Sequence, residues 1–125
     1  MNMTLLQKQA TVLDLGLCEG RHNVPKEYVR EGYIFEYGLK GNEITNVNYL
    51  DKIVADKLDS LIDNNSEIVC INLVVTGLTV ALISVINYCL KLNKFKDVSL
   101  TLLHYDRDKN EYYQQSVDLF IKSKR

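Results

Sequence analysis

Proline and glycine are scarce in this chain, and neither sign of charge dominates it. One proline and six glycines among 125 residues leave no room for a long flexible linker. We therefore expect a single domain over 1–125, with 1–9 as an N-terminal extension and 116–125 as a C-terminal segment. The 15 basic and 16 acidic side chains give a net charge of -1. Bulk binding of DNA or RNA normally requires a basic excess, so it is not expected.

Paired cysteine and histidine motifs are also missing. The three cysteines, Cys18, Cys70 and Cys89, form no CxxC spacing, and their odd number argues against a disulfide scaffold. Together with only two histidines they show no metal-ligand spacing, so neither a metal nor another cofactor is predicted. Cysteines within apolar segments favour a reducing compartment.

The sequence pattern indicates no targeting or membrane segment. Residues 1–9 lack a basic stretch followed by an apolar core, so no secretory signal is predicted. The longest apolar run, 68–92, is interrupted by polar residues and by a turn signal. It is therefore typical of a strand followed by a helix and not of a membrane span. We expect a cytoplasmic protein with no membrane partner.

Hydrophobic periodicity predicts alternating strands and helices. Apolar residues recur every three or four positions over 48–63, which predicts an amphipathic helix capped by Asn46 or Asn48. The nearly continuous apolar run 68–75 is typical of a parallel strand covered on both faces. The other expected elements are a helix over 80–92, strands over 10–17, 33–36, 98–105 and 111–115, and a short edge strand at 43–45. The segment 116–125 fits either a helix or a strand.

The order of these elements predicts an α/β fold. Strand 68–75, helix 80–92 and strand 98–105 form a βαβ unit, which implies a Rossmann-like layered domain with a mainly parallel sheet. An antiparallel hairpin over 98–115 would close one edge. Parallel strands present their functional loops at their carboxyl ends. We therefore expect three loops, 18–23, 76–79 and 104–107, to meet at one edge of the sheet.

The turn Thr76-Gly77-Leu78-Thr79 is the first of these loops that is a candidate functional site. A helix that starts here has free backbone N–H groups and a partial positive charge, so its start is suited to an anion. Gly77 permits a sharp turn, and the hydroxyls of Thr76 and Thr79 could bind phosphate oxygens. A plain βα turn, with Thr79 as the helix cap, is the alternative. Neither GxGxxG nor a Walker lysine is present, which disfavours dinucleotide binding and NTP hydrolysis.

The loop after the first strand is the second candidate. Glu19, Arg21, His22 and Asn23 place a carboxylate, a guanidinium, an imidazole and an amide within five residues. Arg21 suits bidentate phosphate binding, and His22 could act as an acid or base near neutral pH. The alternative is a solvated surface loop.

The third candidate is the strand end at His104-Tyr105-Asp106-Arg107. Tyr105 could stack on a base and Arg107 could bind an anion, whereas Asp106 and Arg107 could equally form only the hairpin turn. A lone histidine such as His104 is more often a structural residue. The adjacent tyrosines at 112–113 could also stack on a base, or serve as cross-strand partners.

These motifs carry a resemblance. The strand–Thr-Gly-Leu-Thr–helix segment, followed by a strand that ends in His-Tyr-Asp-Arg, resembles the core of small CARF-like proteins over residues 10–22 and 68–107. These are Rossmann-like domains of CRISPR signalling, and they include ring nucleases and viral counter-defence proteins. The resemblance implies that a cyclic oligonucleotide is bound, commonly by a homodimer. The positions implicated are Thr76, Gly77 and Thr79, with Arg21 and His22 on the neighbouring loop.

Two functions follow as expectations. The leading one is a homodimer that binds a nucleotide-derived small molecule at the strand ends, through the 76–79 turn, Arg21 and a tyrosine. It would either sequester this ligand or cleave it as a metal-independent ring nuclease, the ribose 2′-hydroxyl attacking in line with His22 as acid or base. The alternative is a non-enzymatic protein-interaction or assembly module, in which the apolar segment 117–121 could form part of the interface.

Overall fold

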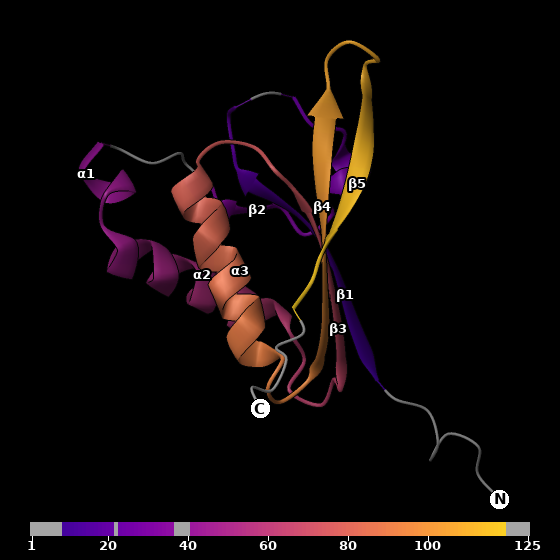
Figure 1. The fold of residues 1–125 in the computed structure, drawn as a ribbon. Helices are drawn as coiled ribbons and strands as arrows, with labels where there is room; N and C mark the ends of the chain where they lie inside the picture. The colour runs from indigo at the N-terminus through magenta and orange to yellow at the C-terminus, as the bar shows by residue number, and fades with distance from the viewer. Residues whose placement is uncertain (1–8, 22, 37–40, 120–125) are drawn as a thin grey trace, which may run out of the picture.

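The protein is an α/β domain in which helices pack on one face of a five-stranded sheet (Figure 1). The computed structural model describes residues 9–21, 23–36 and 41–119. Its elements are β1 (Ala10–Cys18), the 3-10 helix η2 (Lys26–Tyr28), β2 (Tyr33–Phe35), α1 (Gly41–Ile44), α2 (Val47–Leu61), β3 (Ile68–Val74), α3 (Thr79–Leu92), β4 (Asp97–Asp106) and β5 (Glu111–Val117).

The sheet has the strand order β2-β1-β3-β4-β5. β1 pairs in parallel with β2 and β3, and β3 pairs in parallel with β4, so that Leu15, Leu73 and Leu102 lie side by side. β5 returns antiparallel to β4, with His104 opposite Tyr113. This arrangement confirms the predicted Rossmann-like layered fold, mainly parallel with an antiparallel hairpin at one edge. It also brings the carboxyl ends of β1, β3 and β4 to the same end of the sheet.

The hydrophobic core lies between the sheet and the two long helices. Alternate residues of each strand point to this side, as the period of two requires. α2 presents Leu50, Val54 and Leu58 to the core, and α3 presents Ala81, Val85 and Cys89. The buried residues that alternate along β1, β3 and β4 are Leu13, Leu15, Leu17, Val69, Ile71, Leu73, Val98, Leu100 and Leu102.

The opposite face of the sheet differs from the prediction for 68–75. That strand was expected to be covered on both faces, but α2 and α3 contact each other and lie on the same side of the sheet (Figure 1). On the other side Asn72 is only half-buried, and its Nδ2 donates to Oδ1 of Asp14 on β1 over 3.0 Å. Tyr33 covers the carboxyl end of this face, where a Cβ added at Gly16 would lie 2.4 Å from its ring.

Three local features bear on the predicted elements. The edge strand expected at 43–45 is wrong, because this segment lies at the end of the short helix α1. The cap by Asn46 is confirmed, since its side chain accepts a hydrogen bond from the Tyr49 N–H over 3.1 Å. β5 extends to Val117 and Leu119 is buried, whereas 120–125 lie outside the described residues.

In the part of the chain that the structure describes, every helix falls short of the length and apolarity needed to cross a bilayer.

Candidate functional site

A pocket of about 890 Å³ lies between the loop that follows β1 and the β4–β5 hairpin. The hairpin projects beyond the end of β3 (Figure 1), so one side of β4 faces this loop across the pocket. Its lining includes two positive side chains, two negative ones and two amides: Arg21, Arg107, Glu27, Glu111, Asn23 and Asn110. The pocket is thus at the edge of the sheet where the predicted loops were expected to meet.

Four predicted site residues are brought together here. Arg21 and Asn23 come from the loop after β1, and Tyr105 and Arg107 come from the end of β4 and the turn after it. No ion pair involves Arg21 or Arg107 within the described residues. Two guanidinium groups with their hydrogen-bonding capacity uncommitted to carboxylates are well suited to a phosphate.

The hairpin turn positions Arg107 through a neighbouring aspartate. Oδ1 of Asp106 accepts hydrogen bonds from the backbone N–H groups of Asp108 at 2.9 Å and Lys109 at 3.2 Å. This is the Asx geometry by which aspartate stabilises turns. The role in the turn that the sequence allowed for Asp106 is therefore its observed role, while Arg107 lines the pocket.

Aromatic rings form the other wall of the pocket. The Tyr112 ring on β5 lies 4.7 Å from the ring of Tyr28 and 5.2 Å from that of Tyr105, measured between centroids. Burial and the neighbouring phenols of Tyr105, Tyr28 and Tyr33 raise the pKa of Tyr112, so its hydroxyl stays protonated. Tyr28, Tyr105 and Tyr112 together form a tyrosine cluster. A nucleobase can stack on such rings whatever its identity, because every base has a π-face.

Tyr28 was not predicted as a site residue. It lies on η2, far along the chain from β5, and only the folding of 25–33 back over β1 brings it to Tyr112. Its one sequence signal was that an aromatic residue lies in the loop that follows a parallel strand. Tyr113, for which the sequence allowed either base stacking or cross-strand pairing, lies opposite His104 on the hairpin and also lines the pocket.

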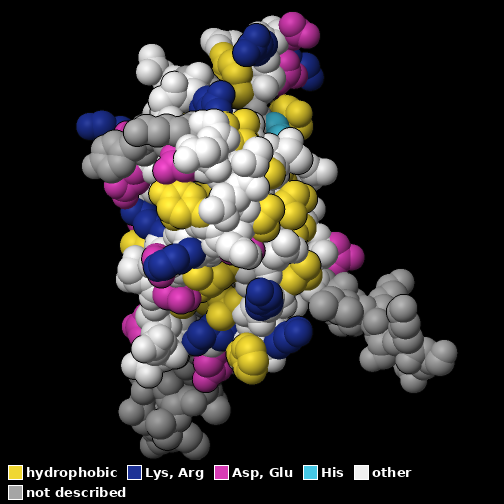
Figure 2. All heavy atoms as spheres, turned by 90° about the vertical axis from the view of Figure 1, so that its left-hand side faces the viewer, with side chains coloured by type: hydrophobic (Ala, Val, Ile, Leu, Met, Phe, Trp, Pro, Cys, Tyr) yellow, Lys and Arg dark blue, Asp and Glu magenta, His cyan; other side chains and the backbone are white. Residues whose placement is uncertain are grey.

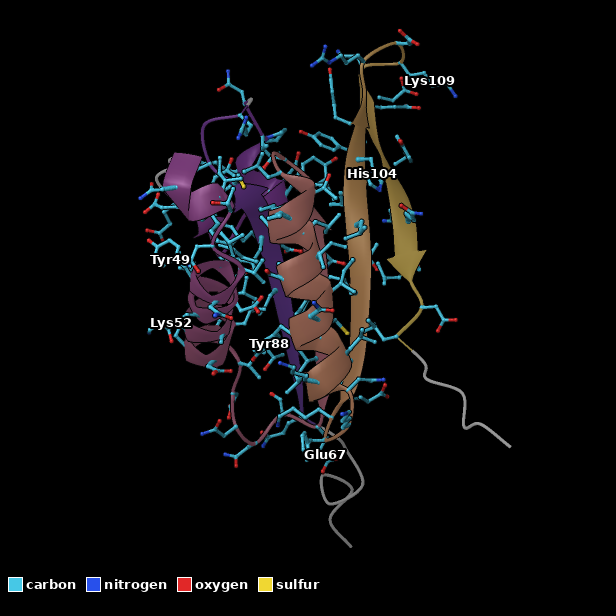
Figure 3. The ribbon with its side chains drawn as sticks, turned by 60° about the vertical axis from the view of Figure 1, so that its left-hand side comes forward. Tyr49, Lys52, Glu67, Tyr88, His104 and Lys109 are labelled. Atoms are coloured by element: carbon cyan, nitrogen blue, oxygen red, sulfur yellow. The ribbon has the colours of Figure 1, made fainter. Side chains whose placement is uncertain are left out.

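His104 lines the same pocket, although the sequence favoured a structural role for it. Its Nε2 lies 2.8 Å from Oε1 of Gln115, and its ring stacks on Tyr113 at a centroid distance of 5.2 Å. Figure 3 shows it on β4, in the part of the hairpin below the tip that carries Lys109. Because the Gln115 carbonyl oxygen accepts this hydrogen bond, Nε2 is its donor. The two contacts fix the orientation of the ring.

The Thr76–Thr79 turn is a strand-to-helix connection, as predicted, but Thr76 points inward. Its side chain is only 2% exposed. Its Oγ1 accepts a hydrogen bond from the Cys18 N–H over 3.0 Å and donates one to the Cys18 carbonyl over 2.6 Å. Both interactions are internal to the protein, so this hydroxyl joins the ends of β1 and β3 instead of facing an open anion site.

Gly77 and Leu78 are also engaged by the end of β1. Gly77 has a φ of +99°, and a Cβ added there would lie 2.8 Å from Cys18 Sγ and 3.4 Å from Arg21 Nε. The Cys18 thiol accepts a hydrogen bond from the Leu78 N–H, and burial raises its pKa although this bond and the Arg21 charge oppose the shift. The turn therefore requires glycine for its own conformation and packing.

Thr79 is the first residue of α3, and the helix cap is Leu78, which makes no side-chain capping bond. The alternative role of Thr79 as the cap is therefore wrong. Its side chain is exposed. The turn adjoins the pocket through Val75, which lines it, and through Arg21, which lies against Gly77. The turn itself forms no part of the pocket wall.

The remaining predicted residues of the first loop lie elsewhere. Glu19 is exposed, its N–H donates to the Phe35 carbonyl over 3.0 Å, and its charge adds to burial in raising the pKa of Tyr33. It does not line the pocket. His22 lies outside the described residues. Among the residues that are described, no three His, Cys, Asp or Glu side chains gather as metal ligands would.

Comparison with known proteins adds no relative: no family model, no curated protein sequence and no solved structure matches the chain.

Proposed function

We propose that the pocket between the β1 loop and the β4–β5 hairpin binds a nucleotide-derived small molecule. One observation carries the proposal: two arginines without ion-pair partners among the described residues, Arg21 and Arg107, share a pocket with the tyrosine cluster. Guanidinium groups bind phosphate, and aromatic rings bind bases. The combination favours a ligand that contains both.

The carboxylates of the pocket favour a nucleotide over a bare anion. Glu27 and Glu111 also line it. They would repel free phosphate, but they can accept hydrogen bonds from ribose hydroxyls or from base amino groups, as acidic residues do in other nucleotide sites. The volume of about 890 Å³ lies within the range of small-molecule sites.

The ligand class implied by the resemblance to CARF-like proteins is a cyclic oligonucleotide, and we include it in the proposal. The protein would act in the cytoplasm as a homodimer, either sequestering this signal or cleaving it. In the cleavage reaction the ribose 2′-hydroxyl gives up its proton and its oxygen attacks the adjacent phosphorus in line, forming a 2′,3′-cyclic phosphate. The 5′-oxygen leaves and takes up a proton, and positioning and electrostatics would promote the step without a metal. Arg21 would stabilise the phosphoryl oxygens, and His22 would transfer a proton.

The first experiment is a thermal-shift series against mononucleotides, linear and cyclic oligonucleotides, and inorganic phosphate. A ligand bound only by the folded protein raises the melting temperature. We expect a shift with at least one nucleotide and none with phosphate alone. Absence of a shift with every nucleotide would leave the protein-interaction module as the better account.

Matched variants then locate the binding. Arg107→Gln and Arg21→Gln should each weaken the nucleotide, whereas Lys109→Gln should not, because Lys109 lies on the same hairpin turn but does not line the pocket. The loss of one charge-assisted contact of about 1.5–3 kcal/mol corresponds to roughly 10- to 150-fold in affinity. Equal effects of all three variants would indicate nonspecific charge attraction.

Chromatography of the nucleotide after incubation distinguishes cleavage from sequestration. Linear products that persist in EDTA would indicate the metal-independent nuclease. Intact ligand recovered after tight binding would indicate sequestration.

A further inference from the structure

The outer face of α3 is uncharged as far as Leu90, whereas the neighbouring helix α2 carries exposed charges. From Thr79 to Leu90 the helix contains no Asp, Glu, Lys or Arg. Ile83 on its exposed side is 48% accessible. On α2, by contrast, Lys52 and Asp56 form an exposed ion pair of 2.8 Å. Among the described residues, α3 packs against the sheet and α2, so its outer positions Thr79, Ile83 and Asn87 face solvent without a charge.

A groove of about 520 Å³ lies beside this face, between α2 and α3. Its walls include Asp51 and Ala55 from α2, and Tyr88 and Leu92 from α3. The Tyr88 hydroxyl donates to Oδ1 of Asp59 over 2.5 Å, which fixes the ring between the helices (Figure 3). The groove is therefore formed before anything enters it.

At the rim of the groove, Phe95 projects into solvent. It is 85% exposed, the highest value among the large hydrophobic residues of the described chain. Figure 2 views this side of the molecule and shows hydrophobic side chains with Lys and Arg side chains among them. One face thus carries both an apolar projection and an apolar groove, the combination that lets a surface bind a copy of itself.

The charges around these two features are complementary. Lys91 and Lys94 both precede Phe95 in the sequence, and Lys91 lines the groove rim on the α3 side. On the α2 side the rim carries Asp51. In a two-fold arrangement the basic side of one copy faces the acidic side of the other, so opposite charges meet twice.

We infer that the α2–α3 face is the interface of a two-fold symmetric homodimer, in which Phe95 of each copy enters the groove of the other. Lys91 of one copy then lies against Asp51 of the second. The inference specifies the dimer contained in the proposed function, but it does not depend on the nucleotide. Among the described residues, none lines both the groove and the pocket at the strand ends.

Sedimentation equilibrium on the full chain tests the interface. We expect a dimer at micromolar concentration, and we expect Phe95→Ser to weaken it by about 30-fold or more, as for a central hydrophobic contact. The control is Val12→Ser, which removes a 58%-exposed apolar residue from the opposite face of the sheet and should leave the dimer intact. A monomeric wild-type protein, or a Phe95→Ser protein as dimeric as the wild type, would overturn the inference.

A charge exchange gives a second and sharper test. Lys91→Asp and Asp51→Lys should each be monomeric, because each homodimer would contain two like-charge contacts. An equimolar mixture of the two should form a heterodimer, since both contacts are then of opposite charge. Failure of the mixture to associate would count against this pairing.

Nucleotide binding measured on Phe95→Ser separates this inference from the proposed function. Binding retained by a monomer would support both the interface and a pocket within one chain. If the wild-type protein is a dimer but binds no nucleotide, the result would support the inferred interface and contradict the proposed function.

Discussion

The hydroxyl of Thr76 bridges the two backbone polar groups of Cys18, accepting from its N–H over 3.0 Å and donating to its carbonyl over 2.6 Å. β1 and β3 separate at this point, since their pairing ends at Gly16 and Val74. A buried backbone group without a partner is costly, and here one side chain satisfies two of them. The turn that adjoins the pocket is thereby held in place.

This relationship predicts a stability effect. Thr76→Val keeps the shape of the side chain but removes both hydrogen bonds, so the free energy of unfolding should fall by about 1–3 kcal/mol. Thr76→Ser keeps the hydroxyl and should lose less. Urea denaturation of the three proteins measures the difference. If Val were tolerated as well as Ser, the bridge would contribute nothing.

A matched pair of glycines tests the packing of the turn. Gly77 and Gly20 both have positive φ, of 99° and 85°, but only Gly77 has neighbours within reach of an added Cβ. Gly20→Ala should cost about 1–2 kcal/mol from backbone strain alone. Gly77→Ala should cost more, because its Cβ would lie 2.8 Å from Cys18 Sγ. Equal melting temperatures for the two variants would contradict this packing.

Aromatic stacking in the pocket is tested at Tyr112, whose ring contacts Tyr28 and Tyr105. Tyr112→Phe keeps the ring, and we expect it to keep most of the nucleotide affinity. Tyr112→Leu should weaken binding by roughly 5- to 150-fold, the equivalent of about 1–3 kcal/mol per stacked base. Calorimetric titration of both variants with the nucleotide found by thermal shift makes the measurement. Equal losses in the two would assign the effect to the hydroxyl and not to stacking.

Cys89 predicts a stability change in alkaline solution. Burial raises the pKa of this fully buried thiol from 9.0 to about 12. Between these values the unfolded chain loses the proton while the folded chain keeps it, so the free energy of unfolding falls as pH rises. The slope from this group is at most about 1.4 kcal/mol per pH unit.

Cys89→Ala isolates that contribution. Below pH 9 the variant should be less stable than the wild type by a constant amount, because it leaves a small cavity. Between pH 9 and 12 the gap should narrow as the wild type loses its thiol contribution. Denaturation curves at several pH values measure the gap. A gap that stays constant throughout would show that Cys89 does not titrate as expected.

Much of the fold could be predicted because it depends on local periodicity. The helix expected over 48–63 and the strand expected over 68–75 are observed as α2 and β3. The face of the sheet that the helices cover could not be predicted, since a continuous apolar run does not show which side is packed. The segment 43–45 carried too few residues for a periodic signal, and it forms part of a helix.

The sequence could predict those residues of the candidate site whose position follows from the strand order alone. The rule that loops meet at the carboxyl ends of parallel strands placed Arg21, Asn23, Tyr105 and Arg107 together, and all four line one pocket. Tyr28 depends on how one loop folds back over another strand. The inward orientation of Thr76 likewise depends on a contact with Cys18 that is distant in the sequence. No local sequence pattern indicates the position of Tyr28 or the orientation of Thr76.

The most direct test of the nucleotide pocket is a map of backbone amide chemical shifts during titration with the nucleotide identified by thermal shift. The account predicts saturable changes at Arg21, Asn23, Tyr28, Tyr105, Arg107 and Tyr112, with the α2–α3 groove unaffected. Saturable changes centred on Asp51, Tyr88 and Phe95, with none at the strand ends, would contradict it.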